Sequence, residues 1–261
     1  FLRRDQSEAS GMKLLLDIGN TRIKWAQYKN GALSESQALV HVGHSRRECL
    51  EEIAAKLEPS ALWVSCVAGS EMQESIFQWA DEAWGLEPEL IHASAQACGV
   101  TNAYAKPEKL GVDRWLAVIA AHHRGKGAAC VVDAGTCLTF DVVDAKGKHL
   151  GGLIAPGVAN QRSAVWGRTQ VRARPRDEQL EALATSTDDA VSFGTLHGPI
   201  GLVERVLNLV QTKLKVERLL LTGGELNELS PYLPDWEVVP DLVLEGIAHY
   251  ANNSPPLLDG E

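Results

Sequence analysis

One short pattern occurs twice in this chain of 261 residues, and it constrains the fold more than any other feature. In each copy an apolar strand ends in Asp-x-Gly, first at Asp17 and again at Asp133, and a second extended run follows. A turn glycine comes 14 residues after each aspartate (31 − 17 and 147 − 133), at Gly31 and Gly147. Equal spacing predicts a duplicated strand–loop–strand unit.

A loop of this kind is suited to phosphate. The carboxylate at the strand end can hold a divalent cation, and the glycine lets backbone N–H groups approach phosphate oxygens. One copy alone more often marks an ordinary turn, but two matched copies favour a nucleotide gripped by two facing loops. The arrangement resembles the fold of sugar kinases, acetate kinase, actin and the Hsp70 ATPase, and the other common nucleotide-loop motifs are absent from the sequence.

The resemblance implies an α/β fold with two similar ribonuclease-H-like lobes, built from duplicated βββαβαβα units, and the alternating strand and helix patterns agree. Ser45 and Glu48 form a capping box, and Gly85 suits a helix end. Helices are predicted at 45–57, 71–84, 110–124, 187–213 and 241–250, and strands at 22–28, 61–67, 137–143 and 217–221.

Four segments follow from this reading. We expect a leader over 1–11, because Met12 directly precedes the first strand. Residues 12–120 would form an N-terminal phosphate-loop and substrate lobe, and 121–251 a C-terminal phosphate-loop and adenosine lobe. Residues 252–261, which are polar and contain proline, are expected to form a flexible tail.

Composition excludes several classes of function. A formal charge of −9 and a pI near 5.4 argue against a nucleic-acid partner, and the arginine-rich run 168–176 is read as a solvated loop. No apolar run reaches the roughly 20 residues that cross a membrane, and no secretory signal is present, so we expect a cytoplasmic protein. Five scattered cysteines predict reduced, mostly buried thiols.

Further blocks give the resemblance its specificity. They occur in order as Asp17-Ile18-Gly19-Asn20-Thr21-x-x-Lys24-Trp25, Asn102-x-Tyr104-x-x-Pro107 with Leu110-Gly111-Val112-Asp113-Arg114-Trp115, Asp133-Ala134-Gly135-Thr136, Gly151-Gly152-x-Ile154-x-Pro156-Gly157, Thr187-x-x-Ala190-x-x-x-Gly194, and Leu221-Thr222-Gly223-Gly224 with Pro240-Asp241-Leu242. Together they resemble the type III pantothenate kinases, the family that includes the Bvg accessory factor homologues. The resemblance covers Met12 to about Tyr250, and Cys137 stands where a small residue such as alanine is more usual.

The resemblance implies that ATP phosphorylates the hydroxyl of pantothenate to give 4'-phosphopantothenate, the first step toward coenzyme A. Asp113 would be the catalytic base, Asp17 would hold Mg²⁺, and Asp133 would bind a monovalent cation, K⁺ or NH₄⁺. The implied ATP-binding residues are Asp17, Ile18, Gly19, Asn20, Thr21, Arg22, Ile23, Lys24, Thr136, Gly223 and Gly224. The implied pantothenate-binding residues are Tyr104, Gly111, Val112, Asp113, Arg114 and Thr187.

The residues alone leave plainer readings open. Asp113 could be a carboxylate favoured by a helix dipole, and Thr187 a plain N-cap. Arg114 could be an exposed helix residue and Tyr104 a loop anchor.

Two other function classes also remain: a regulatory or non-catalytic ATP-binding protein of the same fold, and a small-molecule kinase for another hydroxyl substrate. The resemblance implies a homodimer as well. The apolar helix face of Leu110, Trp115, Val118 and Ile119 is its predicted interface, with monomer core as the alternative.

Overall fold

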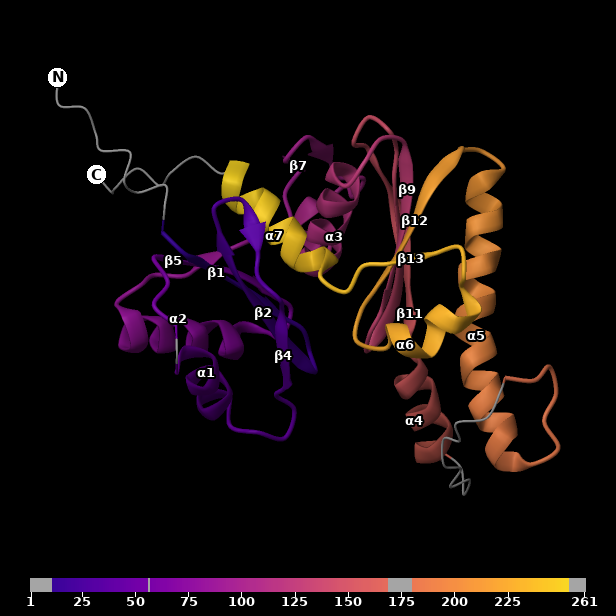
Figure 1. Cartoon of the computed structure of the whole chain (residues 1–261). Helices are drawn as coiled ribbons and strands as arrows, with labels where there is room; N and C mark the ends of the chain where they lie inside the picture. Colours follow the sequence, from indigo (N-terminus) through magenta and orange to yellow (C-terminus); the bar gives the residue numbers. More distant parts are fainter. Residues whose placement is uncertain (1–10, 56, 169–179, 254–261) are drawn as a thin grey trace. The chain divides into compact units, whose positions relative to one another are not determined.

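The computed structural model describes residues 11–55, 57–168 and 180–253, and it divides into two compact units (Figure 1). Unit 1 takes its described residues from 1–120 and 241–261, and unit 2 from 121–240. The final helix therefore belongs to unit 1, although it follows unit 2 in the sequence. The expected leader, the side chains of the run 168–176 and most of the expected tail lie outside the described residues.

The sheet of unit 1 has the order β3-β2-β1-β5-β6, with β4 also paired to β2. Its central strand β1 (Lys13–Ile18) runs antiparallel to β2 (Arg22–Lys29) and parallel to β5 (Ala61–Cys66). The shorter strands are β3 (Ala32–Leu33), β4 (Gln37–Val40) and β6 (Glu89–Leu90). Four of the six β1 residues are buried, as a strand covered on both faces requires.

Helices cover the two faces of this sheet (Figure 1). On one face, α1 (Arg46–Ala54) and α2 (Ser70–Trp84) pack on Leu14, Leu16 and Ile18. On the other face, α7 (Leu242–Asn253) packs against β1, β2 and β5. The remaining elements are α3 (Val112–His123), a 3₁₀ turn (Pro107–Lys109), and the short strands β7 (Gln96–Ala97) and β8 (Val100–Thr101).

Local sequence signals set two of these helix ends. Ser45 is the N-cap of α1, and its hydroxyl accepts a hydrogen bond from Glu48 N at 3.5 Å. Gly85 ends α2 in the left-handed region at φ 63°, and its N–H bonds Asp81 O at 2.8 Å. The predicted N-cap at Ser45 and the predicted helix end at Gly85 are confirmed, because each depends on neighbours within four residues. The return bond of a full capping box, from Ser45 N to the Glu48 carboxylate, is not found among the described residues.

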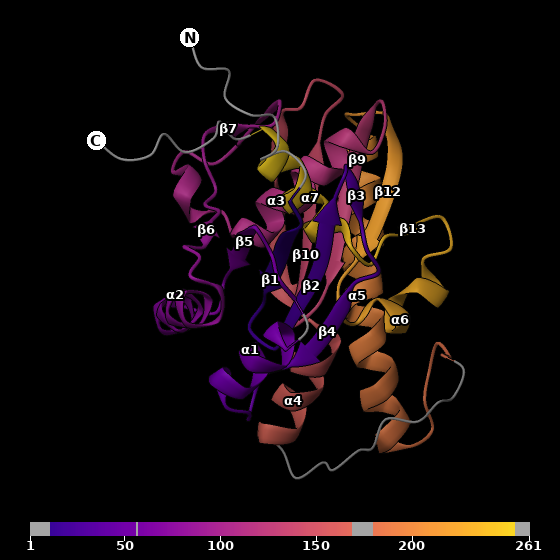
Figure 2. The same cartoon turned by 60° about the vertical axis from the view of Figure 1, so that its left-hand side comes forward.

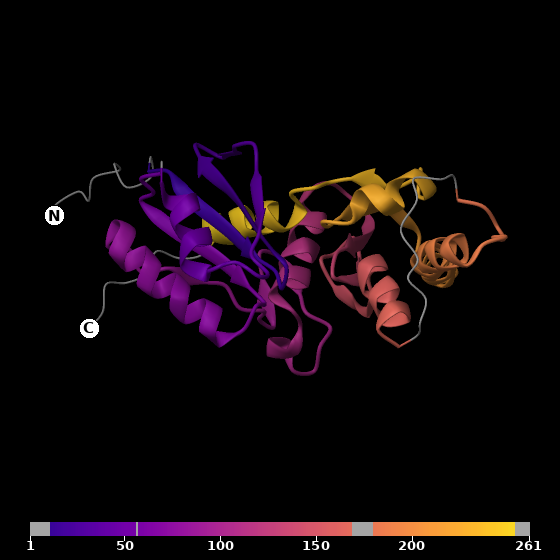
Figure 3. The same ribbon diagram turned by 90° about the horizontal axis from the view of Figure 1, so that it is seen from below.

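Unit 2 repeats the sheet order of unit 1, as β11-β10-β9-β12-β13. Its strands are β9 (Ala128–Ala134), β10 (Cys137–Val143), β11 (His149–Pro156), β12 (Val216–Thr222) and β13 (Glu237–Val238). Its helices are α4 (Val158–Arg168), α5 (Thr187–Gln211), α6 (Leu226–Leu229) and a 3₁₀ turn (Ser230–Tyr232). Figure 2 shows α5 beside the sheet, and Figure 3 views α5 nearly end-on with α4 next to it. Side chains from α5 and α6 complete the apolar core against β9 and β10.

The matching sheet orders confirm the predicted α/β fold of two similar lobes, but the equal spacing has two different origins. In unit 1, Asn30 (φ 53°) and Gly31 (φ 82°) form a two-residue turn between β2 and β3. In unit 2 the turn is longer, and the Asp144 carboxylate accepts from Lys146 N at 2.8 Å and Lys148 N at 2.9 Å. In unit 1 the loop after the aspartate is longer and the turn is shorter, and in unit 2 the reverse holds. The 14-residue spacing is therefore equal although its parts differ in length.

The proposed dimer face on α3 is wrong. Leu110, Trp115, Val118 and Ile119 are at most 3% exposed within the single chain, so they are core side chains and are not available to a second copy. The prediction for the cysteines holds: all five are free, and Cys49, Cys66 and Cys130 are buried. Among the described residues, no helix is both long and apolar enough to cross a bilayer.

Candidate active site

Two carboxylates of unit 1 lie within electrostatic range of each other, Asp17 near the end of β1 and Asp113 at the start of α3. Asp17 is opposite Ser65 in β5, and the Ser65 hydroxyl donates to Asp17 Oδ1 at 3.0 Å. Burial, followed by the charge of Asp113, raises the pKa of Asp17 to about 7, against the lowering effects of Ser65 and Lys24. The site thus concentrates negative charge where water is scarce.

The backbone at Gly111 makes room for the Asp113 carboxylate. A Cβ atom on residue 111 would lie 2.6 Å from Asp113 Oδ1, closer than any normal contact. Asp113 Oδ1 also accepts a hydrogen bond from Arg114 N at 2.8 Å. Glycine at 111 and the first turn of α3 therefore fix the position of this carboxylate. The side chain of Val112, between them, is buried.

Arg114 is buried, with a relative exposure of 5% for the whole residue. Its Nη1 donates to Tyr104 Oη at 3.1 Å, and the guanidinium carbon lies 5.9 Å from the centre of the Tyr104 ring. Asn102 fixes the loop, because its Oδ1 accepts from Tyr104 N at 2.9 Å and its amide nitrogen donates to Ser94 O at 3.2 Å. The structure thus brings Tyr104 and Arg114 together beside Asp113, and Arg114 is not an exposed helix residue.

The first loop, residues 19–21, connects β1 and β2. Gly19 N donates to Arg22 O at 3.0 Å, so this N–H closes the turn. The sequence had instead predicted it as a hydrogen-bond donor to phosphate. The side chains of Ile18 and Ile23 are fully buried in the core, which leaves only their backbone for a ligand. Asn20 is exposed at the tip of the loop.

Lys24 lies on β2 directly opposite Asp17. Its Nζ forms an ion pair with Asp241 Oδ1 at 3.2 Å, and both side chains are about one-third exposed or less. The motif Pro240-Asp241-Leu242 therefore connects to the first phosphate-loop hairpin through Lys24.

The second loop, Gly135 and Thr136, connects β9 and β10 in unit 2. Gly135 N closes this turn on Cys137 O at 3.1 Å. Thr136 O accepts from Gly157 N at 3.1 Å and from the Asn160 amide at 2.7 Å, and its side chain is exposed. This loop is thus held by the start of α4.

Gly223 packs directly against Asp133. It has a φ of 103°, and a Cβ there would overlap both Asp133 Oδ1 and Ala134 O. Gly224, the next residue, is exposed. Glu225 N then donates to Ala134 O at 2.6 Å, and the Glu225 carboxylate accepts from Val158 N at 2.9 Å. Asp133, Gly223 and Gly224 therefore form one local cluster.

Thr187 is the exposed first residue of α5. The N-cap is Ser186, whose hydroxyl accepts from Asp189 N at 3.1 Å, so the plain reading of Thr187 as an N-cap is wrong. Thr187 belongs to unit 2, whereas the other predicted pantothenate-binding residues belong to unit 1.

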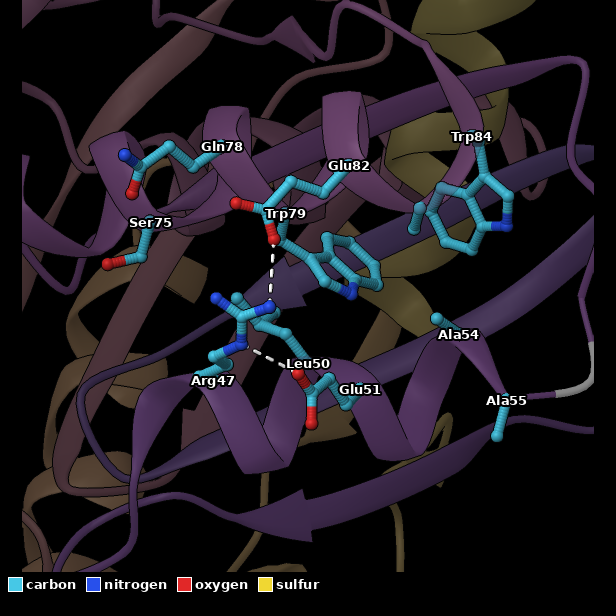
Figure 4. Close-up of a pocket in the computed structure, with 11 residues that line it drawn as sticks. Arg47, Leu50, Glu51, Ala54, Ala55, Ser75, Gln78, Trp79, Glu82 and Trp84 are labelled. Atoms are coloured by element: carbon cyan, nitrogen blue, oxygen red, sulfur yellow. Dashed lines mark hydrogen bonds and ion pairs between the residues drawn. The ribbon is translucent and has the colours of Figure 1, made fainter.

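A cavity of about 400 Å³ lies between α1 and α2 (Figure 4). Leu50, Trp79 and Trp84 line it, and Arg47 bridges Glu51 and Glu82 at 2.7 and 2.9 Å. None of the predicted site residues lines this cavity. In the described ranges, no cluster of three or more His, Cys, Asp or Glu side chains forms a ready metal site.

Sequence reasoning missed four residues that hold the predicted site: Ser65 on Asp17, His41 on the first loop, Asn160 on the second loop, and Glu225 on Ala134 and the start of α4. Ser65 had a usable signal, since it is a polar residue inside an apolar strand beside β1. The others make their contacts from 20 or more residues away along the chain. No local pattern reveals such contacts.

Two lobes of one sheet order, each with an aspartate at a strand end beside a glycine loop, define an α/β fold of the actin, Hsp70 and sugar kinase class. The family model for type III pantothenate kinase matches residues 13–209. The chain is 36% identical over 252 residues to a type III pantothenate kinase of Nitrosococcus oceani, covering 93% of this chain and 95% of the relative. The chain therefore belongs to the type III pantothenate kinase family.

Solved structures support the fold. A putative Baf family transcriptional activator from Campylobacter jejuni is similar with a TM-score of 0.59 and 22% identity, covering 92% of this chain and 97% of that one. The activator of 2-hydroxyisocaproyl-CoA dehydratase from Clostridium difficile, solved with bound ADPNP, reaches a TM-score of 0.51 at 15% identity, covering 92% of both chains. At these identities the likeness concerns architecture alone.

Proposed function

We propose that Asp113 accepts the hydroxyl proton when this chain phosphorylates pantothenate. The reaction is that of its family: ATP gives its terminal phosphoryl group to the pantothenate hydroxyl, leaving ADP and 4'-phosphopantothenate for coenzyme A synthesis. The supporting observation is the fixed Asp113 carboxylate beside the buried Arg114 and its partner Tyr104. Phosphoryl transfer needs little from the protein beyond positioning, charge stabilisation and one proton acceptor.

The residues of unit 1 fit a divalent cation. Burial and the charge of Asp113 raise the pKa of Asp17, and a hard cation with oxygen ligands would relieve such repulsion. Asp17 is the residue that would hold Mg²⁺, directly or through water. The bound ion would neutralise charge on the phosphates.

Asp133 is the proposed ligand for K⁺ or NH₄⁺. Its carboxylate oxygen and Ala134 O surround the space that a Cβ on residue 223 would fill, so hard oxygen atoms converge there. Gly223 and Gly224 are proposed to contact the adenosine of ATP, and the Thr136 hydroxyl its phosphates. From the first loop, the backbone of Asn20 and Thr21 would bind phosphate, with Lys24 adding positive charge.

Pantothenate carries a carboxylate, amide groups and hydroxyls, so its pocket needs a cation and neutral donors. Arg114 supplies a buried cation and Tyr104 a hydroxyl, both in fixed positions. A buried guanidinium pairs strongly with a carboxylate. We assign the pantothenate carboxylate to Arg114, with Tyr104, Gly111, Val112 and Thr187 as the other proposed contacts.

The homodimer and the cytoplasmic location stay predictions. An interface must now use surfaces other than the buried face of α3. Asp113 is present and held in place, which favours catalysis over a purely regulatory ATP-binding role.

The test is an assay with ATP, magnesium and potassium that identifies the phosphorylated product by mass. Pantothenate should be consumed, and a set of sugars should not. Asp113→Asn should lower kcat by about 10² to 10⁴, because an amide keeps the shape but accepts no proton. Glu108→Gln, at an exposed carboxylate in the same segment, serves as the matched control. An Asp113→Asn variant with more than roughly a tenth of wild-type kcat would contradict the base assignment.

A further inference from the structure

The first phosphate loop is held by a residue that no motif of the sequence includes. We propose that His41 positions this loop for nucleotide binding, an inference that rests on the proposed role of residues 19–21 as phosphate ligands. His41 directly follows β4, which pairs with β2, and its side chain is 9% exposed. Its Nε2 lies 2.8 Å from Gly19 O, and its backbone N–H donates to Thr21 O at 3.1 Å. One residue therefore contacts both ends of the loop.

The contact with Gly19 sets the direction of a neighbouring donor. A carbonyl oxygen accepts and never donates, so His41 Nε2 carries the hydrogen. Gly19 O and Asn20 N–H belong to the same peptide unit, and in a trans peptide these two groups point in opposite directions. The hydrogen bond from His41 therefore aims Asn20 N–H away from the imidazole. In the described part of the chain, Asn20 N–H has no acceptor of its own.

Without His41, little else fixes this peptide plane. Glycine has the widest choice of backbone conformation, and the nearest atom to a Cβ on Gly19 would be Arg22 O at 3.5 Å, an ordinary distance. The bond from Gly19 N to Arg22 O holds the preceding peptide unit but not the one that contains Asn20 N–H. His41 thus orders the donor before phosphate arrives, which lowers the entropy cost of binding.

Two amide substitutions separate positioning from bulk. In His41→Gln the side-chain nitrogen reaches about as far as the imidazole Nε2, whereas in His41→Asn it is one methylene shorter and misses Gly19 O. We expect His41→Asn to raise KM for ATP about tenfold, the effect of losing one hydrogen bond, while KM for pantothenate changes less than about twofold. His41→Gln should restore KM for ATP to within about threefold of wild type. His44→Asn, at an exposed histidine three residues away, is the control.

Nucleotide binding measured by calorimetry without pantothenate separates this inference from the proposed function. If the wild-type chain fails to phosphorylate pantothenate, the function fails, yet the ATP titration still compares His41→Asn with wild type. A folded His41→Asn variant with wild-type melting temperature and wild-type ATP affinity overturns the positioning role. If that variant does not fold, nitrogen NMR of the wild-type imidazole decides: hydrogen on Nε2 supports the inference, and the Nδ1–H tautomer overturns it.

Discussion

The two Asp-x-Gly loops close with the same kind of turn but differ in what holds them. In each, the glycine N–H closes the hairpin, at 3.0 Å on Arg22 O in the first and 3.1 Å on Cys137 O in the second. The second loop is held by the Asn160 amide on Thr136 O and, above all, by backbone packing, with Gly157 and Gly223 so close that neither leaves room for a Cβ. Around the first loop, Gly19 has no such crowding, and the main features are a carboxylate pair and one imidazole.

The difference shows which part of a duplicated unit is free to diverge. The turn itself is local and is repeated, whereas its supports come from distant segments that differ between the copies. The first loop depends on charge and on side-chain hydrogen bonds. The second depends on close packing of glycines. Substitutions at the first loop should therefore mainly lower activity, and substitutions at the second should mainly lower the free energy of unfolding.

Among the substitutions that compare the two loops, the largest expected effect is at the first loop. Asp17→Asn should lower kcat by about 10² to 10³, because the proposed magnesium ligand supplies several kcal/mol of transition-state stabilisation. Asp81→Asn, at an exposed carboxylate on α2, is the control. Turnover is to be measured at saturating ATP and pantothenate over a magnesium series, and wild-type kcat in the Asn variant would contradict the assignment.

The same variant should not be less stable. The folded pKa of Asp17, about 7, exceeds its ordinary value of 3.8, so its contribution to stability is fully present below 3.8 and is lost as pH rises through about 7. At pH 8 without metal, Asp17→Asn should therefore melt at or above the wild-type temperature. Lost turnover with retained stability would separate a functional defect from misfolding.

The next effect is in stability and tests the second loop. Gly157→Ala would place a Cβ in overlap with Gly135 O, and we expect it to lower the free energy of unfolding by about 1–3 kcal/mol. Gly19→Ala, whose Cβ would meet only an ordinary contact, should change it by less than about 0.5 kcal/mol and instead weaken ATP binding. Urea unfolding of both variants provides the measurement. Equal losses of stability would remove the distinction between the loops.

Local signals made much of the fold predictable. The apolar runs before Asp17 and Asp133, the cap at Ser45 and the glycine at 85 each act through neighbours a few residues away, and their elements form as predicted. The two-residue strands β3, β6 and β13 were not predicted, because pairing with a longer strand, and not their own pattern, makes them strands. Helix α4 was not predicted either, because its start is capped by Glu225, a residue far away along the chain.

The candidate site was predictable where it lies within motifs. Tyr104, Asp113 and Arg114 come from one segment of the sequence, and the structure places them together. The supports His41 and Glu225 could not be predicted, since each acts on a loop through contacts that exist only after the sheet has formed. Apolar spacing also misled us on α3, because a fully buried helix and a dimer face show the same pattern.

A smaller effect concerns the cation at Asp133. Replacing potassium with sodium should lower activity about tenfold if Asp133 holds a monovalent ion that stabilises the phosphates by about 1.4 kcal/mol. Asp133→Ala should show equal activity in both salts. Asp144→Ala, in the turn after β10, controls for loss of a carboxylate in the same hairpin. Full wild-type activity in sodium alone would contradict the proposed role of Asp133 as a ligand of K⁺ or NH₄⁺. Any remaining dependence on a cation would then be that of magnesium at the first loop.

The smallest effect is expected at Glu225, and it tests whether the second loop depends on charge. Burial raises the pKa of this carboxyl, although hydrogen bonds from Ala159 N and Val158 N oppose the shift. Its folded pKa therefore exceeds the ordinary 4.5, so its contribution to stability is fully present below 4.5 and declines as pH rises through the folded value. Glu225→Gln removes this titration but keeps an oxygen that can cap α4, and it leaves the bond from residue 225 N to Ala134 O unchanged.

We expect Glu225→Gln to lower the free energy of unfolding by at most about 1 kcal/mol, as for an altered helix cap. This loss should shrink between pH 4.5 and pH 8 in paired urea titrations of the variant and the wild type. A difference that grows with pH would mean that the ionised carboxylate stabilises the second loop, and the contrast between a charge-dependent and a packing-dependent loop would fail.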